Sequence, residues 1–140
     1  MRLLLDTLVW LWWYTEPERL AAIARWQIGD SRNEVYLSAA SVWEMAIKRW
    51  LGKLPLPESV GSYVARRLAA DAVRDLPISA DHAAAVETLE LLHRAPFDRL
   101  LIVQARHEGL RLLTIDDQVL AYGSPAVDVR IEGIRGAPLH

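Results

Sequence analysis

The sequence predicts an α/β domain of the kind in which helices cover both faces of a central parallel β-sheet, here of about five strands. Short apolar runs alternate with longer stretches whose apolar residues recur at helical spacing. Strands separated by helices of this length favour a parallel sheet, because the chain must cross over between neighbouring strands. The 140 residues are enough for one hydrophobic core, and no linker divides them. We therefore expect a single domain over 1–140, with a frayed tail over 133–140.

The strands are predicted from short β-type runs and from the turn residues around them. The leucine triplet 3–5 is apolar on both sides of a strand, which predicts a buried position in the middle of the sheet. Gly109 and the Gly-Ser-Pro segment 123–125 bound the later runs. In chain order, the five predicted strands are 3–5, 35–38, 75–78, 111–114 and 127–131.

The helices are predicted where apolar residues follow a 3.6-residue period. Turn segments at 29–31 and 52–57 separate several of them. The helix that follows Pro96 is apolar nearly all round, which predicts that it is buried. In chain order, the predicted helices are 7–14, 17–28, 40–50, 58–72, 80–92, 98–108 and 117–121. A set at helical spacing is predicted to be core: Trp43, Ile47, Trp50 and Leu51.

Composition argues against a secreted or membrane protein. An apolar fraction of 52% with 24% charged residues is ordinary for a globular protein. Without cysteine the chain has no disulfide and no thiolate metal site. Asp6 interrupts the leucine run too early for a signal peptide, and no apolar run approaches the ~20 residues that span a bilayer. We expect a soluble, cytoplasmic protein with no membrane contact.

Net charge says little about nucleic-acid binding. The chain carries 16 basic and 18 acidic residues, for a net charge of −2. If four acids are gathered in a metal site, 18 less 4 leaves 14 acidic residues against 16 basic ones, a mildly positive remainder. The overall acidity is therefore weak evidence against a nuclease.

Four carboxylates stand where strands hand over to helices or where helices begin: Asp6, Glu44, Asp98 and Asp116. Ligands of open α/β sheets bind beyond the carboxyl ends of the strands, so these acids can meet at one sheet edge. Two carboxylates about 5 Å apart repel by roughly 3 kcal/mol at an effective dielectric of about 20. A divalent cation reverses that sign, and all-oxygen ligation favours Mg²⁺ or Mn²⁺ over zinc.

Each acid also has an ordinary interpretation. Asp6 can cap the following helix, and Glu44 can pair with Lys48 four residues later on an exposed helix face. Asp98, in a first helical turn, favourably meets the helix dipole. Asp117 is the alternative to Asp116 as the fourth ligand. The metal interpretation is favoured by the four acids together.

The segments around these acids resemble PIN-domain ribonucleases, most closely the VapC-type toxins of bacterial type II toxin–antitoxin systems. The resemblance rests on LLLDT at 3–7, SAASVWEMAIK at 38–48, HRAPFDRLL at 93–101 and LLTID at 112–116. It covers nearly the whole chain, with the segments in the family's order and spacing. The family often has other polar residues at the fourth acidic position.

The resemblance implies a Mg²⁺- or Mn²⁺-dependent endoribonuclease that hydrolyses RNA phosphodiester bonds with a cation-activated water. It also implies a homodimer and a cognate antitoxin that blocks the site, with operator DNA bound only through that antitoxin. By motif, the acidic metal site would be Asp6, Glu44, Asp98 and Asp116, and Thr7 would orient ligands, water or substrate. Which RNA is cut does not follow.

Two arginines flank the predicted site, and other functions stay open beside it. Arg94 and Arg99 are candidate phosphate contacts, because arginine binds phosphate bidentately. His93 fits a surface or packing role better than a substrate contact. The main alternative is a catalytically silent PIN-like module that binds RNA or protein. A phosphoryl-transfer enzyme is disfavoured, because Thr7 stands where such families carry a second acid.

Overall fold

The computed structural model describes residues 1–92 and 94–130. They form a five-stranded sheet in the order β3-β2-β1-β4-β5, and every neighbouring pair is parallel. The strands are β1 Arg2–Leu5, β2 Glu34–Ser38, β3 Val73–Leu76, β4 Arg111–Thr114 and β5 Ala126–Asp128. The helices are α1 Thr7–Thr15, α2 Ala22–Gly29, α3 Ala39–Trp50, α4 Val60–Ala70, α5 Ala80–Ala85, α6 Pro96–Glu108 and α7 Asp117–Leu120. Two short 3₁₀ turns, η1 Pro17–Arg19 and η2 Val86–Thr88, complete the described elements.

The central strand β1 explains why the sheet needs cover on both sides. Its three leucines are fully buried, and their side chains alternate between the two faces. Leu3 and Leu5 belong to one hydrophobic cluster and Leu4 to the other. The predicted α/β class, parallel sheet and central first strand are confirmed.

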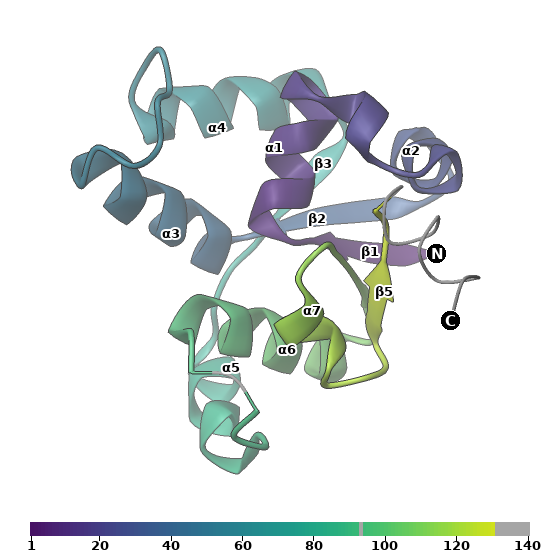
Figure 1. The fold of residues 1–140 in the computed structure, drawn as a ribbon, viewed down its shortest axis with the longest axis vertical. Helices are drawn as coiled ribbons and strands as arrows, with labels where there is room; N and C mark the ends of the chain where they lie inside the picture. Colours follow the sequence, from purple (N-terminus) through teal and green to yellow (C-terminus); the bar gives the residue numbers. More distant parts are fainter. Residues whose placement is uncertain (93, 131–140) are drawn as a thin grey trace.

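The helices divide between the two faces of the sheet, as Figure 1 shows. Helices α1, α2 and α4 supply apolar side chains to the cluster that holds Leu3 and Leu5. Helices α6 and α7 supply them to the cluster around Leu4. Helix α3 leaves the end of β2 at the side of the sheet and contributes to both clusters through Met45 and Ala40. No helix within the described ranges is long and apolar enough to cross a membrane.

Tertiary contacts break the predicted helix 17–28 in two. Leu20 forms an antiparallel bridge with Arg130, and the Ala21 amide donates to the Val129 carbonyl at 2.9 Å. This extended pair separates η1 from α2, because a residue in a bridge cannot continue a helix. The periodicity of the segment contained no sign of a partner 110 residues away in the sequence.

Other predicted boundaries move by a few residues. Strand β3 lies two residues before the predicted 75–78, and the helix predicted over 80–92 stops at Ala85 and continues as η2. Helix α4 begins at Val60, where Ser59 caps it through a bond from the Ser62 amide. For the strand predicted over 127–131, β5 is found, but residue 131 and the predicted tail 133–140 lie outside the described residues.

The predicted core set at α3 is wrong for Trp43, Trp50 and Leu51, whereas Ile47 is half-buried. Trp43 is 50% exposed and Trp50 85% exposed, and Leu51 is also exposed. The buried residues of this helix are Ala40, Ser41 and Met45. The apolar period was correctly recognised, but the helix lies at the side of the sheet and only its narrow face of smaller residues packs inward.

Candidate active site

The candidate site lies at the carboxyl edge of the sheet, where the strand order reverses. Strands β1 and β4 are neighbours in the sheet, while β2, the next strand in the chain, pairs with the other side of β1. Asp6 directly follows β1 and Asp116 follows β4 by two residues. The Asp6 amide donates to the Leu113 carbonyl at 2.9 Å, which joins the two strand ends. Such a reversal point is where open α/β sheets bind ligands.

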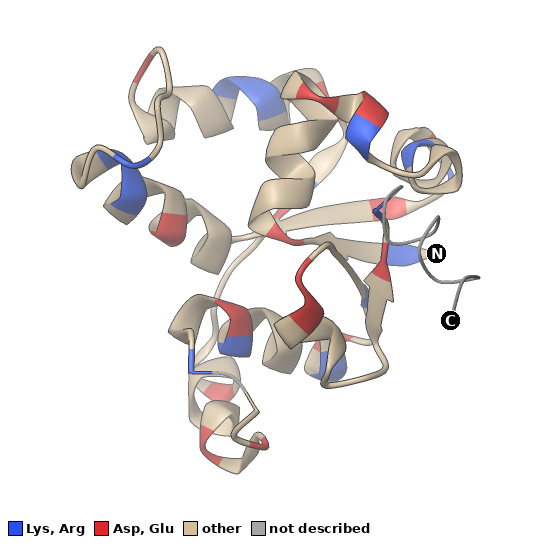
Figure 2. Cartoon of the chain, viewed as in Figure 1, with Lys and Arg blue, Asp and Glu red and all other residues tan. Residues whose placement is uncertain are grey.

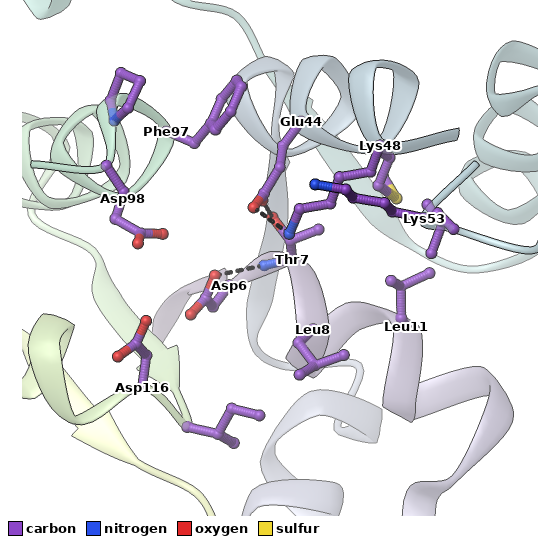
Figure 3. Close-up of a pocket in the computed structure, with 15 residues that line it drawn as sticks. Asp6, Thr7, Leu8, Leu11, Glu44, Lys48, Lys53, Phe97, Asp98 and Asp116 are labelled. Atoms are coloured by element: carbon purple, nitrogen blue, oxygen red, sulfur yellow. Dashed lines mark hydrogen bonds and ion pairs between the residues drawn. The ribbon is translucent and has the colours of Figure 1, made fainter. Parts of the chain in front are cut away.

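One cavity of about 640 Å³ opens at this edge and collects all four predicted acids. Figure 2 shows acidic segments of four elements, at the end of β1, on α3, at the start of α6 and around the start of α7, arranged about the same region. In the close-up of Figure 3, the carboxylates of Asp6, Asp98 and Asp116 turn toward a shared space, and Glu44 lies beside them on α3. The other polar lining residues are Thr7, Lys48 and Lys53.

Asp6 is held in place on both carboxylate oxygens. Its Oδ1 accepts from the Thr7 amide at 2.7 Å, and its Oδ2 accepts from the Thr114 hydroxyl at 2.6 Å. Burial, together with the negative charges of Asp98 and Glu44, raises the pKa of Asp6 to about 6, against the lowering effect of the two hydrogen bonds. Asp6 therefore both caps α1 and lines the cavity.

Glu44 is oriented by a chain of hydroxyl groups and by a lysine. Its Oε1 accepts from the Thr7 hydroxyl at 2.7 Å, and the oxygens of Thr7 and Ser41 are 2.9 Å apart. The Lys48 ammonium lies 2.8 Å from its Oε2. The Glu44–Lys48 pair foreseen for an exposed helix face thus exists, but the Glu44 side chain is only 14% exposed and faces the cavity.

Asp98 and Asp116 enter the cavity from the starts of two helices. Asp98 lies in the first turn of α6, which begins at Pro96. Asp116 caps α7 by accepting from the Gln118 amide at 2.9 Å, and its own amide donates to the Thr114 hydroxyl. Its neighbour Asp117 does not line the cavity and pairs with Arg130 at 2.6 Å. Of the adjacent acids, the geometry thus brings Asp116 to the other three.

The donor chemistry of the cavity fits a hard divalent cation, because every acidic group that lines it offers carboxylate oxygen. Among residues 1–92 and 94–130, however, no three acidic or imidazole groups are already arranged to hold a metal ion. Two of the carboxylates already take part in polar contacts: the Lys48 ammonium pairs with one oxygen of Glu44, and the Thr114 hydroxyl donates to one oxygen of Asp6. A cation bound at Glu44 would compete with the Lys48 ammonium for the same oxygen.

Comparison with known proteins gives the family. The PIN domain model matches residues 3–123. Ribonuclease VapC22 of Mycobacterium tuberculosis is 32% identical over 126 residues, which cover 87% of this chain and 92% of that protein. The chain belongs to the PIN-domain family, in its VapC branch. Ribonuclease VapC16 of the same organism is 49% identical over 69 residues, and this match spans 46% of the chain and 48% of VapC16.

Solved structures agree on the PIN fold. VapBC2 from Rickettsia felis, bound to a DNA fragment from its promoter, has a chain with a TM-score of 0.66 at 12% identity, covering 92% of this chain and 99% of its own. A toxin–antitoxin complex from Klebsiella pneumoniae gives 0.60 at 17% identity, with coverages of 89% and 95%. FitAB bound to the IR36 DNA fragment gives 0.64 at 23%, with 91% and 94%. At these identities the likeness carries the fold alone.

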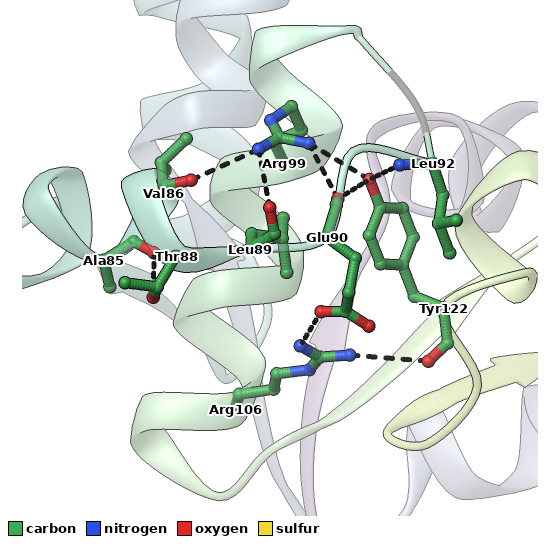
Figure 4. A network of polar contacts seen from close by, with 9 residues as sticks. All are labelled: Ala85, Val86, Thr88, Leu89, Glu90, Leu92, Arg99, Arg106 and Tyr122. Carbon is green, nitrogen blue, oxygen red and sulfur yellow. Dashed lines mark hydrogen bonds and ion pairs between the residues drawn. The ribbon is translucent and has the colours of Figure 1, made fainter.

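The structure gives Arg99 a contact set that differs from its predicted role in this PIN protein. Arg99 does not line the acidic cavity. Figure 4 shows its guanidinium donating to backbone carbonyls of residues 86, 89 and 90 and to the Tyr122 hydroxyl, at 3.0–3.3 Å. Arg99 thus holds the segment after α5 against α6 and the α7–β5 connection. We therefore leave Arg99 out of the proposed substrate contacts.

Arg94 is exposed and lines a separate hollow with Leu91, Leu92, Ala95 and Gln118, next to the acidic cavity through the shared residue Ala95. It remains a candidate phosphate contact at the edge of the site. His93, for which a surface or packing role was predicted, lies outside the described residues.

Three polar residues of the site were not predicted from the sequence. Thr114 bonds Asp6, Ser41 bonds Thr7, and Lys53 lines the cavity. A partial signal existed for two of them, because Ser41 stands one helical turn before Glu44 and Thr114 ends the strand before Asp116. Nothing in the sequence indicated that Lys53, in a loop after α3, would reach the acids.

Proposed function

We propose that this VapC-type PIN protein is a metal-dependent endoribonuclease that acts as the toxin of a toxin–antitoxin pair. The observation that supports this most is the meeting of four acids, distant in sequence, in one cavity at the carboxyl edge of β1 and β4. Two relatives that carry the name ribonuclease VapC add support. A structural role alone explains each acid singly, but not their common cavity.

Mg²⁺ or Mn²⁺ would be held by carboxylates of Asp6, Asp98 and Asp116, with Glu44 as the fourth. A bound divalent cation supplies Lewis acidity toward a phosphoryl oxygen and lowers the pKa of a bound water. Thr114 and Thr7 keep Asp6 in position, and Thr7 also aims Glu44 into the cavity. In the proposed hydrolysis, a bond forms from the water oxygen to phosphorus, while the bond from phosphorus to the leaving ribose oxygen breaks. The water gives up one proton and the leaving oxygen takes one up from solvent, which leaves a phosphate monoester and a free hydroxyl group.

The test is RNA cleavage by the purified chain with Mg²⁺ or Mn²⁺, with chelator, and after single substitutions. We expect chelator, Asp6→Asn, Asp98→Asn and Asp116→Asn each to lower the rate at least ~100-fold, as losses of metal-ligating groups do. Asp117→Asn is the matched control, since the same change one residue away leaves the cavity lining intact. Equal cleavage by Asp116→Asn and wild type, or cleavage that survives chelator, would contradict the proposal.

The alternative of a catalytically silent binding module predicts a different result in the same experiment. Such a module would bind RNA or a protein partner while no cleavage above the Asp98→Asn background is seen with either cation. Retained binding without cleavage would therefore favour the alternative.

We propose a cognate antitoxin as the protein partner, with operator DNA bound only through it. Support comes from two structural neighbours, VapBC2 bound to promoter DNA and a toxin–antitoxin complex. Expression of the chain alone should arrest growth, and coexpression of a small antitoxin from the neighbouring reading frame should relieve the arrest. Growth arrest by Asp98→Asn as well would separate toxicity from the proposed chemistry.

We also propose a homodimer that acts in the cytoplasm, where its proposed substrate is found. Exposed large apolar side chains, including Ile23, Trp26 and Trp50, offer surface for such contacts. Light scattering after size-exclusion chromatography should give twice the 15.8 kDa chain mass. A mass that stays at one chain up to high micromolar concentration would argue against the dimer.

A further inference from the structure

Two lysines share the acidic cavity, and they differ in what they contact. The Lys48 ammonium lies 2.8 Å from Oε2 of Glu44, one helical turn before it on α3. Lys53 comes from the loop after α3 and lines the same cavity, but it makes no side-chain hydrogen bond or ion pair with any residue that the structure describes. Figure 3 shows both side chains reaching toward the Glu44 side of the cavity.

The bond to Lys48 conflicts with a ligand role for Glu44. The Thr7 hydroxyl and the Lys48 ammonium together use both oxygens of Glu44. A cation that approached Glu44 would meet the positive charge of Lys48 at hydrogen-bond distance from the same oxygen. Because a divalent ion and an ammonium group repel each other, the two cannot share this oxygen without one moving.

Lys48 is able to move. Its side chain is 50% exposed, so water can replace Glu44 around the ammonium group, and the lysine stem is long and flexible. An ion pair whose lysine is this exposed is easily exchanged for water or another anion. Once released, the ammonium would still stand at the mouth of the cavity beside Lys53, where a substrate phosphate must arrive.

We propose that Lys48 is an exchangeable internal cation: it neutralises Glu44 before a divalent ion binds, then leaves Glu44 and, together with Lys53, contacts an RNA phosphate. This inference rests on the proposed function and adds two substrate-contacting residues to it. The two basic residues of the cavity come from α3 and the following loop, and they lie on the opposite side from Asp98 and Asp116. Lys48 thus lowers the affinity of the cavity for a divalent ion and raises its affinity for RNA.

The test measures metal and RNA binding separately. Mn²⁺ alone is titrated into the full chain by calorimetry, for wild type, Lys48→Met, Lys48→Gln and Lys53→Met. Lys53→Met is the matched control, since it removes an equal charge from the same cavity without touching Glu44. We expect both Lys48 variants to bind Mn²⁺ roughly 3- to 10-fold more tightly than wild type, and Lys53→Met to show a clearly smaller gain.

RNA binding should change in the opposite direction. With the inactive Asp98→Asn background to prevent cleavage, adding Lys48→Met or Lys53→Met should each weaken binding of an RNA oligonucleotide. Each should also lower the slope of log affinity against log salt by about 0.7, as expected for one lost phosphate contact to a single strand. The proposal is overturned if Lys48→Met gains no more Mn²⁺ affinity than Lys53→Met, or if its salt slope is unchanged.

Failure of the proposed function gives a separate signature. If wild type and Asp98→Asn bind Mn²⁺ equally, or neither binds it, the acidic cavity is not a metal site and the inference falls with it. If Asp98→Asn loses Mn²⁺ while the lysine variants behave alike, the metal site stands and only the exchange by Lys48 is wrong.

Discussion

Asp6 is the one buried carboxylate among the residues that the structure describes, and it lies at the centre of the sheet edge. Burial, with the charges of Asp98 and Glu44, raises its pKa from 3.8 to about 6. Folding therefore forces an unfavourable charge into place at neutral pH. The hydrogen bonds from Thr7 and Thr114 reduce this cost without removing it. A residue suited to a bound cation thus destabilises the metal-free fold.

We predict that Asp6→Asn stabilises the metal-free protein at pH 7.5 by about 1–3 kcal/mol, which urea unfolding in chelator would measure. The sign follows from proton uptake. Between about pH 4 and 6 the folded state binds more protons at Asp6 than the unfolded state does, so wild-type stability falls as pH rises through this window. The gain should therefore vanish below about pH 4. A variant less stable than wild type at pH 7.5 would contradict the prediction.

At the scale of elements, helix α3 and helix α1 show two opposite uses of tryptophan. Trp10 on α1 is fully buried, with edge-on contacts to Tyr14 and Tyr63 at centroid distances of 5.2 and 5.8 Å. Trp50, at the end of α3, is 85% exposed. The residue type is the same, but Trp10 lies inside a helix that packs on the sheet and Trp50 ends a helix at the side of it.

We predict that Trp10→Ala lowers the free energy of unfolding by about 3–5 kcal/mol. Trp50→Ala should change it by less than about 0.5 kcal/mol, because its side chain contributes little to the core of one chain. Urea unfolding at low protein concentration gives both values. A large loss for Trp50→Ala that depends on protein concentration would mean that a second chain covers Trp50.

Two arginines near the start of α6 differ in role: Arg99 bonds backbone carbonyls, whereas Arg94 is exposed. Arg99→Met should cost about 1–3 kcal/mol, because several backbone carbonyls of residues 86–90 lose their donor. Hydrogen exchange should then rise over that segment, while the salt dependence of RNA binding stays as in wild type. Arg94→Met should do the reverse: stability is kept, and the salt slope falls by about 0.7. An unchanged exchange rate in Arg99→Met would contradict the structural role.

At the scale of the whole molecule, four elements meet at the proposed cation site, so we expect metal binding to stabilise the folded chain. A divalent ion bound only by the folded chain adds about 2.7 kcal/mol at 100 times its Kd. We predict that saturating Mn²⁺ raises the melting temperature by about 5–10 °C. Differential scanning calorimetry with Mn²⁺ and with chelator measures this, and Asp98→Asn should abolish the rise. An equal rise in Asp98→Asn would place the stabilising ion elsewhere.

The sequence by itself determined the parallel α/β class, the order of the strands, the location of Asp6, Asp98 and Asp116 at element ends and that of Glu44 within a helix. These are local properties, set by apolar period, turn residues and caps within a few residues. The family, too, was visible in four short segments, and the PIN match over residues 3–123 confirms it.

Only the tertiary structure decided which of these local features meet. The bond from Thr114 to Asp6 joins residues 108 positions apart, and the bridge at Leu20 depends on Arg130. Tertiary structure also decided that Trp43 is exposed, that Arg99 bonds backbone carbonyls outside the cavity, and that Lys53 lines the cavity. A helical period states which residues share a face but not whether the fold covers that face, because cover comes from segments far away in the chain.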